Sequence, residues 1–411
     1  MTVNLITFVS PLHRQTPIRN SHEVLLAELE KYFTINLVDH SNIGKLTQDD
    51  FSIVFIATGG VEKLVAQHFE ALPRPTALLT DGIYNSLPAA LEIASWLHNR
   101  GMKNEILHGE PTDIAKRLFI LYNNFRAQRA LSGRRIGVIG APSGWLIASN
   151  VDFLLAKRRW EVEYINVPIE RVYEYYALTS EDEVGEEAAV LAEKALACRE
   201  ASPEDLLKAM KLHAAIRKLV REERLDALTL SCFRVIDQVG TTGCLALALL
   251  NDEGIIAGCE GDLQAVFTMM VAKTLTGQAP FMGNPSLVNV RNNELVLSHC
   301  TVGLKQTERF IIRSHFETGT GIGIQGILPE GEVTLVKCGG ECLDEYYLSS
   351  GTLVENTNHI NMCRTQVKIR MNTPADYFLK NPLGNHHILL HGNHEAVLNE
   401  FFQANGCKRI E

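Results

Sequence analysis

The spacing of apolar residues changes near residue 287, and this change constrains the fold more than any other feature. Before it, short apolar runs such as 51–58 alternate with segments such as 22–33, in which apolar residues recur every three or four positions. After it, apolar and polar residues alternate with a period of two, as in 332–338. Strands that alternate with helices predict parallel sheets in an α/β architecture, whereas a period of two predicts antiparallel strands.

Length and boundary signals divide this pattern into three domains. A chain of 411 residues exceeds what one hydrophobic core usually holds. The polar and basic segment 127–135 separates two alternating regions. We therefore expect a Rossmann-like α/β domain over residues 1–130 and a second one over 131–285, each with a parallel sheet. Residues 286–411 are expected to form a β-rich, antiparallel, barrel-like domain.

The charge and the cysteines narrow the class of protein. Lysine and arginine total 39 and aspartate and glutamate total 48, so the net charge is −9. A net acidic chain without a Lys/Arg cluster predicts neither a nucleic-acid partner nor an anionic-membrane partner. The apolar runs are strand-sized, and residues 1–10 lack the basic start of a secretory leader. Nine scattered cysteines, an odd number, favour reduced thiols in a cytoplasmic protein.

Two glycine-rich segments match phosphate-binding loops only in part. Residues 321–326 match G-x-G-x-x-G, yet the residues that follow lead into a β-like run instead of opening a helix, which predicts a hairpin. Residues 140–144 follow a strand but lack the lysine of a P-loop and the order of a nucleophile elbow. Binding of a small anion stays an alternative for that second segment.

Two carboxylates lie at the start of a predicted helix. Glu260 and Asp262 precede an apolar stripe that ends at Gly277, so both lie where the helix dipole favours negative charge. Capping of the helix is one interpretation. The other is a divalent-metal site, because a strand delivers His299 soon afterwards and His386 precedes another strand.

These residues occur in an order that resembles the L-fucose isomerase and L-arabinose isomerase superfamily, in particular its shorter fucose-isomerase-like members. The order comprises Glu260-Gly-Asp262, Phe281-Met282, the strand that ends at His299, and Gly384-Asn-His-His387. The resemblance covers most of the chain. It implies two tandem α/β domains, a C-terminal β-rich domain and the activity of a sugar isomerase.

The resemblance also implies an oligomeric enzyme that binds Mn²⁺ or a similar ion. The ion would be held by Glu260 and His386, with His299 as a further ligand as in the arabinose branch. It would polarise the carbonyl and hydroxyl of a deoxy or otherwise modified sugar, while a carboxylate moves a proton between C1 and C2 through an enediol. Glu260 and Asp262 are the expected catalytic residues. Family sites lie at subunit interfaces of trimers or hexamers, so Arg14 is expected to reach the sugar from a neighbouring subunit.

One position departs from the family pattern. A second carboxylate follows the F-M pair in the family, but Gly283 and Asn284 follow it here. Glycine has no side-chain ligand atom, and asparagine is a neutral, weaker ligand that cannot act as a base. A catalytically silent or regulatory sugar-binding homologue that lost the ion is therefore the alternative to an isomerase. Another metal-assisted enolisation, such as epimerisation or a lyase step, is a third hypothesis.

Further candidates for substrate binding come from other segments. Arg313, His315 and Glu317 share one face of a β-like segment, which predicts either a wall that contacts the sugar or an exposed, ion-paired strand. Cys232 lies at the carboxyl end of a predicted strand, the usual ligand edge of an α/β sheet. The substrate-binding residues predicted from all segments are Arg14, Cys232, Asn284, Arg313, Asn385 and His387.

Overall fold

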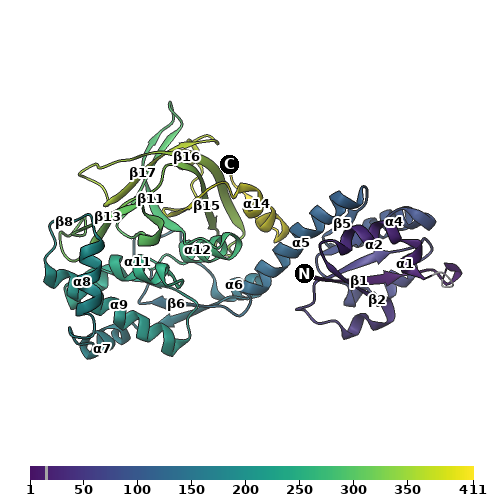
Figure 1. The fold of residues 1–411 in the computed structure, drawn as a ribbon, viewed down its shortest axis with the longest axis horizontal. Helices are drawn as coiled ribbons and strands as arrows, with labels where there is room; N and C mark the ends of the chain where they lie inside the picture. Colours follow the sequence, from purple (N-terminus) through teal and green to yellow (C-terminus); the bar gives the residue numbers. More distant parts are fainter. Residues whose placement is uncertain (14–16) are drawn as a thin grey trace. The chain divides into compact units, whose positions relative to one another are not determined.

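The computed structural model describes residues 1–13 and 17–411, and the chain divides into two compact units, Met1–Arg129 and Ala130–Glu411. Figure 1 labels many of their helices and strands. In the described residues no helix is long and apolar enough to cross a membrane, and no disulfide joins two cysteines.

The first unit is a parallel sheet with helices on both faces. The sheet has the order β2-β1-β3-β4-β5 and consists of β1 (Thr2–Phe8), β2 (Thr34–Asp39), β3 (Ser52–Ile56), β4 (Thr76–Leu79) and β5 (Asn104–Leu107). The helices are α1 (Ile18–Ser21), α2 (Glu23–Glu30), α3 (Glu62–Gln67), α4 (Ser86–His98) and α5 (Pro111–Leu131). Leu5 packs on the side of α2 and α5, and Ile6 packs on the side of α3 and α4. Because both faces are covered, the inner strands β3 and β4 are mostly apolar.

The second unit begins with another parallel sheet, which has the order β10-β9-β6-β7. Its strands are β6 (Arg135–Ile139), β7 (Glu163–Val167), β9 (Ala227–Leu230) and β10 (Ile256–Gly258). The helices of this part are α6 (Phe153–Trp160), α7 (Glu170–Leu178), α8 (Gly185–Lys194), α9 (Pro203–Glu223), α10 (Cys232–Val239), α11 (Cys244–Asp252) and α12 (Leu263–Thr276). Since these strands are parallel, their carboxyl ends meet at one edge, where α/β sheets bind ligands.

Helix α12 connects this sheet to the rest of the unit. Residues 263–272 are all buried, so the helix is enclosed on every side. It contacts β9 and β10 of the parallel sheet as well as β15 (Gly331–Gly339) and β18 (His387–His391) of the C-terminal barrel. Asp262 caps its N-terminus, and Gly277 ends it with a φ of 73°. The residues that precede α12 are therefore anchored to a rigid element.

A closed antiparallel barrel of six strands forms the C-terminal part (Figure 1). The strands follow the order β15-β18-β11-β12-β17-β16, and pairing of β16 with β15 closes the barrel. The other four strands are β11 (Phe281–Asn289), β12 (Glu294–His299), β16 (Glu345–Asn356) and β17 (Thr365–Met371). Phe281, Leu297 and Leu335 belong to one buried core, so alternate residues of these strands face the barrel interior.

Short elements complete the second unit. A three-stranded sheet pairs β13 (Arg309–Arg313) with β14 (Gly323–Ile327) and with β8 (Ala197–Cys198). The antiparallel β13–β14 pair includes residues 323–326 of the G-x-G-x-x-G segment, which therefore lie in a hairpin, as predicted. The remaining α-helices and the last strand of the described residues are α13 (Tyr377–Lys380), α14 (Glu395–Ala404) and β19 (Lys408–Arg409).

The predicted fold class is confirmed, because two parallel α/β sheets precede a closed antiparallel barrel. The barrel starts earlier in the chain than the sequence indicated. Strand β11 begins at Phe281, whereas the expected domain boundary lay at residue 286. The reason is that Phe281 and Met282 are buried apolar residues, which by themselves fit a helix end as well as a strand start.

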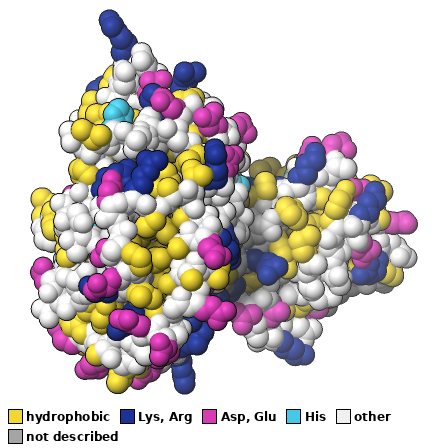
Figure 2. All heavy atoms as spheres, turned by 60° about the vertical axis from the view of Figure 1, so that its left-hand side comes forward, with side chains coloured by type: hydrophobic (Ala, Val, Ile, Leu, Met, Phe, Trp, Pro, Cys, Tyr) yellow, Lys and Arg dark blue, Asp and Glu magenta, His cyan; other side chains and the backbone are white. Residues whose placement is uncertain are grey.

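The surface reflects the acidic composition. The face of the molecule in Figure 2 carries basic and acidic side chains close to one another, with hydrophobic side chains between them. Proteins that bind nucleic acids present a continuous basic patch or stripe. The face in Figure 2 shows Lys and Arg side chains interspersed with Asp and Glu.

Candidate functional site

A pocket opens in the second unit, next to the carboxyl ends of β9 and β10 and the end of β12. Its empty volume is about 420 Å³ when the open solvent at its mouth is included. The side chains that line it and can bind a ligand through polar atoms are Thr242, Glu260, Asn284, His299, His315 and Glu317. Cysteines also line it, namely Cys232, Cys244, Cys259, Cys300 and Cys363.

Glu260 lies in this pocket on a left-handed turn between β10 and α12. Its φ is 61° and that of Gly261 is 71°, an unusual backbone for a non-glycine residue. The backbone N–H of Ser143 donates to the carbonyl of Glu260 at 2.9 Å, and Trp145 Nε1 donates to Glu260 Oε2 at 2.7 Å. The turn after β6 therefore holds both the backbone and the carboxylate of Glu260.

His386 is oriented by Asp262, the residue that caps α12. Asp262 Oδ1 accepts a hydrogen bond from the N–H of Ala265 at 2.8 Å, and Asp262 Oδ2 lies 2.9 Å from His386 Nδ1. Lys337 Nζ lies 3.7 Å from the same Oδ2 atom. The side chains of Asp262, Lys337 and His386 are fully buried. One carboxylate thus fixes the start of a helix and the orientation of an imidazole ring.

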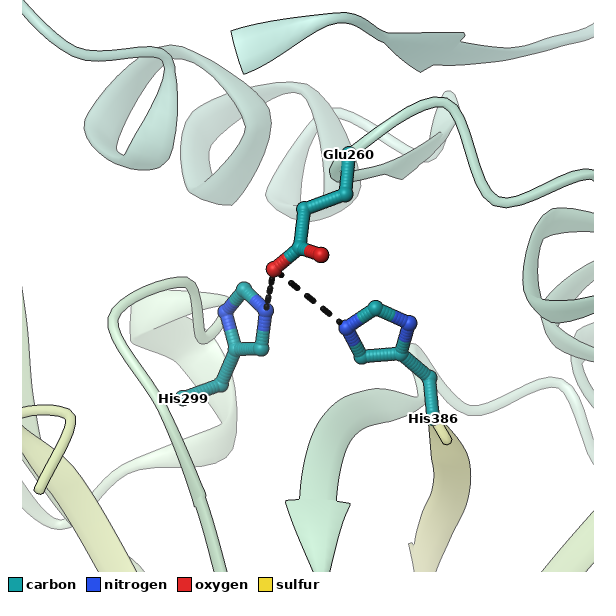
Figure 3. Close-up of side chains that lie close together, drawn as sticks. All are labelled: Glu260, His299 and His386. Atoms are coloured by element: carbon teal, nitrogen blue, oxygen red, sulfur yellow. Dashed lines mark ion pairs between the residues drawn. The ribbon is translucent and has the colours of Figure 1, made fainter. Parts of the chain in front are cut away.

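His299 reaches the pocket from the end of β12. Its Nδ1 accepts a hydrogen bond from the backbone N–H of Thr301 at 3.2 Å. The ring is buried, with a side-chain exposure of 5%, and its centroid lies 5.5 Å from that of His386. The strand and the Thr301 contact together direct Nε2 of His299 toward Glu260 (Figure 3).

Glu260, His299 and His386 converge on one point (Figure 3). Glu260 Oε1 lies 3.5 Å from His386 Nε2 and 3.8 Å from His299 Nε2. Both Nε2 atoms are buried and lack a hydrogen-bond partner in the described part of the chain. The three ligand atoms lie within 4.8 Å of one another, and such an arrangement of one carboxylate and imidazoles suits a divalent transition metal.

The pKa values of the three residues in this cluster are shifted in different directions. Burial opposes the ionisation of Glu260, but its contacts with His386, His299 and Trp145 outweigh burial and lower the pKa of Glu260 to about 2. Burial would also lower the pKa of His386, but its contacts with Asp262 and Glu260 outweigh that effect and raise the pKa to about 9. Burial, reinforced by the positive charge of His386, lowers the pKa of His299 to about 3. At neutral pH Glu260 is therefore an anion and His299 is neutral.

Two further groups have shifted pKa values. Burial raises the pKa of Asp262, but Lys337 and His386 outweigh it and hold that pKa below its usual range. Burial raises the pKa of Glu317, and the negative charge of Glu260 raises it further. The charge of Glu260 therefore acts on Glu317 across the pocket, and Glu317 is the more basic of the two carboxylates.

Strand β11 shows which side chain faces the pocket after the F-M pair. Gly283 pairs with His387 across β18, and a Cβ atom at Gly283 would lie 2.6 Å from Cγ of Leu297 in the barrel core. Asn284 points the other way and lines the pocket, where its Oδ1 accepts a hydrogen bond from Asn385 Nδ2 at 2.7 Å. A carboxylate at position 283 would enter the barrel core, so position 284 is the one that matters for the pocket.

Some predicted residues do not line the pocket. Asp262 and His387 are fully buried, and His387 Nε2 lies 3.1 Å from the hydroxyl of Tyr377 on the barrel side of β18. His387 thus alternates with His386 and faces the opposite direction. Arg313 pairs with Glu200 through Nε at 2.9 Å, because β13 ends at Arg313 and the period of two does not continue.

The other predicted residues have distinct positions. Cys232 does line the pocket, and its Sγ lies 3.5 Å from the backbone N–H of Glu260. Asn385 is exposed and contacts the pocket through Asn284. Arg14 lies outside the described residues. His315 and Glu317, predicted on one face with Arg313, both reach the pocket from the loop after β13.

The sequence interpretation missed Trp145 and Thr242. Trp145 follows the glycine-rich turn 140–144, which was considered only as an anion loop. Its position in the turn that follows a parallel strand was the available signal, because ligand sites lie at that edge. Thr242 lies between α10 and α11 and carries no comparable signal.

Comparison with known proteins gives relatives of one kind, and no family model matches the chain. A sulfoquinovose isomerase of Alkalicoccus urumqiensis is 26% identical over 296 residues, which cover 66% of this chain and 66% of that protein. A sulfoquinovose isomerase of Priestia aryabhattai is 26% identical over 226 residues, 53% of this chain and 50% of that protein. The matched region thus spans half to two thirds of the length of these relatives.

Proposed function

We propose that this protein is a metal-assisted aldose–ketose isomerase that acts on a sulfonated sugar such as sulfoquinovose. The observation that carries the proposal is the convergence of Glu260, His299 and His386 on one point beside a pocket that Glu260 and His299 line. The relatives named sulfoquinovose isomerase support the reaction and the substrate class. The resemblance to fucose and arabinose isomerases, noted from the same residues, supports the same chemistry.

The donor set fits a divalent ion such as Mn²⁺. Glu260 supplies an ionised oxygen, and His386 supplies Nε2, a buried nitrogen without a hydrogen-bond partner among the described residues. Such an ion supplies Lewis acidity to the sugar's carbonyl and neighbouring hydroxyl. Asp262 holds His386 in place through Nδ1, a second-layer contact that commonly supports metal-ligating histidines.

Glu317 is the proposed group that moves the proton between C2 and C1. The pKa of Glu260 is lowered to about 2, so its carboxylate is a weak base. The pKa of Glu317 is raised by burial and by Glu260, which makes its carboxylate the stronger base in the same pocket. Glu317 would take the proton from C2, leaving an enediol, and would return it to C1 while the proton of the hydroxyl moves to the former carbonyl oxygen.

A second candidate function is sugar binding without turnover. The observation that favours it is Asn284, a neutral amide at the pocket position after the F-M pair. Asparagine ligates an ion more weakly than a carboxylate. In this case the pocket would bind a sugar but would hold Mn²⁺ weakly or not at all.

Metal content and product analysis test the proposal together. We expect about one Mn²⁺ per chain after loading, as the Glu260–His386 pair predicts, and conversion of sulfoquinovose to the ketose, with the carbonyl moved from C1 to C2 as seen by NMR. Replacing Glu260 with Gln should abolish metal retention. The exposed Glu330 is a matched control, and its replacement with Gln should change neither property. Sugar binding without bound Mn²⁺ or turnover would favour the second candidate, and a product other than a ketose would indicate a different enolisation.

The role of Glu317 has its own test. Replacing Glu317 with Gln should lower kcat by about 100-fold to 10,000-fold, the usual contribution of a general base, while Mn²⁺ affinity stays within about threefold. The same exchange at Glu330 should leave kcat unchanged. A Glu317→Gln variant with normal kcat would exclude Glu317 as the base.

A further inference from the structure

We infer that the two histidines of the cluster have different tasks: His386 ligates the ion through Nε2, whereas His299 donates its Nε2 proton to an oxygen of the sugar. This inference rests on the proposed function for the identity of ion and sugar. It departs from the expectation that both histidines are ligands. The distances do not separate the two, because both Nε2 atoms lie within 4 Å of Glu260 Oε1, at 3.5 and 3.8 Å.

The hydrogen bond at the far side of each ring decides which nitrogen carries the proton. A neutral imidazole has one N–H and one lone pair, and the partner of one nitrogen fixes the other. His386 Nδ1 faces the carboxylate of Asp262 at 2.9 Å, and an ionised carboxylate only accepts hydrogen bonds. Nδ1 of His386 must therefore carry a proton, and its Nε2 can offer a lone pair to an ion.

His299 has the opposite arrangement. Its Nδ1 lies 3.2 Å from the backbone nitrogen of Thr301, and a backbone N–H can only donate. Nδ1 of His299 therefore presents its lone pair to Thr301, and the single proton of the neutral ring lies on Nε2. A protonated nitrogen has no lone pair for a metal, so this ring presents a donor to the pocket.

Reversing the tautomer of His299 would be unfavourable. Thr301 is buried, and its N–H would lose the acceptor that Nδ1 supplies. An unsatisfied buried N–H is costly, since water cannot replace the lost partner. No carboxylate approaches Nδ1 of His299 among the described hydrogen bonds, in contrast to Nδ1 of His386. The backbone N–H of Thr301 thus fixes the tautomer of His299, and the carboxylate of Asp262 fixes that of His386.

The donor on His299 lacks an acceptor in the protein itself. Its Nε2 is buried without a hydrogen-bond partner in the described residues, and 3.8 Å to Glu260 Oε1 is too long for a hydrogen bond. A sugar oxygen in the pocket would fill that place. A donor aimed at the oxygen that gains negative charge during enolisation stabilises that charge in the transition state.

Pulsed electron paramagnetic resonance of the Mn²⁺-loaded protein tests this division, because it detects nitrogen atoms bonded to the ion. We expect the signal of one nitrogen, unchanged in His299→Ala and lost in His386→Ala. Mn²⁺ affinity should stay within about threefold in His299→Ala and fall by more than about 100-fold in His386→Ala. The exposed His359 is a matched control, and its exchange for Ala should change neither quantity. Loss of a nitrogen signal in His299→Ala would overturn the inference.

Turnover gives a second readout. His299→Ala should lower kcat/KM by about 100-fold, the effect of removing one donor to a developing oxyanion. His299→Gln keeps an N–H donor on a side chain of similar reach, so it should recover at least about tenfold of that loss. Equal losses in the two variants would argue against a donor role.

Nitrogen NMR of ¹⁵N-histidine-labelled protein separates failure of this inference from failure of the proposed function. His299 should show the tautomer with the proton on Nε2, identified by the resonances that vanish in His299→Gln. This measurement needs neither ion nor sugar. A proton on Nδ1 of His299 would overturn the inference, whereas absence of Mn²⁺ binding in the native chain would contradict the proposed function alone.

Discussion

At the scale of single residues, Asp262 links the helix to the site. Its two carboxylate oxygens bind different partners, the N–H of Ala265 and the Nδ1 of His386, and Lys337 balances its charge. Burial of so many ionisable groups is unfavourable unless each is paired. The pairing raises the pKa of His386 to about 9, so a proton competes with any ion for Nε2.

This competition predicts how ion binding depends on pH. Because the pKa of His386 is raised, one proton must leave Nε2 before the nitrogen can ligate, and the proton is present at pH 7. Mn²⁺ affinity should therefore rise by up to about tenfold per pH unit below pH 9 and level off above it. Calorimetry at pH 7 in buffers of different ionisation enthalpy should show release of about one proton per ion.

The Asp262→Asn variant is the control for this prediction. Loss of the Asp262 carboxylate removes the largest contact that raises the pKa of His386, so fewer protons should be released at pH 7. Mn²⁺ affinity at high pH should fall by about 10-fold to 100-fold, because the ring loses the partner that orients it. Proton release that is the same in both proteins would contradict the assigned pKa of His386.

At the scale of elements, the turn between β10 and α12 depends on close packing with the turn after β6. A Cβ atom on Gly261 would lie 2.6 Å from the Cα of Pro142, and the φ of Gly261 is 71°. Only glycine fits a position that has both a positive φ and a backbone neighbour at that distance. The packing holds Glu260 next to Trp145.

Gly261→Ala should destabilise the protein by about 3 kcal/mol or more and weaken Mn²⁺ binding, because Glu260 must move with the turn. Gly277→Ala separates the effect of the positive φ from that of the close neighbour. The φ of Gly277 is 73°, but no atom lies within 4 Å of the added Cβ. That variant should lose only about 1 kcal/mol and should keep its metal affinity. Urea unfolding and metal titration of both proteins measure the difference, and similar losses in both would contradict steric packing of the turn.

The alternation of β11 makes a second prediction at this scale. Asn284→Asp adds a carboxylate to the pocket, so Mn²⁺ affinity should rise by about tenfold through the added charge. Gly283→Asp places its side chain against Leu297 in the barrel core and should destabilise the fold by about 3 kcal/mol without any gain in affinity. A gain in Mn²⁺ affinity for Gly283→Asp would show that the strand alternates the other way.

At the scale of the whole molecule, the candidate site belongs to the second unit. All residues that line the pocket lie between Cys232 and Cys363, within Ala130–Glu411. They come from the parallel sheet, the barrel and the loop after β13, which belong to one compact unit in which α12 contacts both the sheet and the barrel. Ligand binding there stabilises the part of the chain that forms the site.

Hydrogen exchange should show that ion binding stabilises the second unit and not the first. At 100 times its dissociation constant, Mn²⁺ should stabilise the second unit by about 2.7 kcal/mol. Amide exchange in α12 should slow accordingly, whereas exchange in β1 of the first unit should not change. The Glu260→Gln variant is the control and should show no slowing in either segment. Equal slowing in β1 and α12 would mean that the two units unfold as one.

The sequence by itself determined the fold class and the chemical identity of the cluster. Periodicity depends on whether a side chain faces a core, so the switch from 3.6 to two residues separated the α/β region from the barrel. Glu260 was recognisable as a candidate because it lies at the start of a predicted helix, where a carboxylate either caps the helix or can ligate an ion. His299 and His386 were recognisable because His299 lies at the end of a predicted strand and His386 directly precedes another.

Only the tertiary structure decided which side chains share the pocket and which proton each ring carries. Position 283 faces the barrel core and position 284 faces the pocket, because β11 pairs with β18 in one register. Glu317 and Trp145 joined Glu260 from loops whose paths no local pattern encodes. The tautomer of His386 depends on a carboxylate far away in the sequence, a contact that exists only after the sheets have packed, whereas that of His299 depends on the N–H of Thr301, two residues further along the chain.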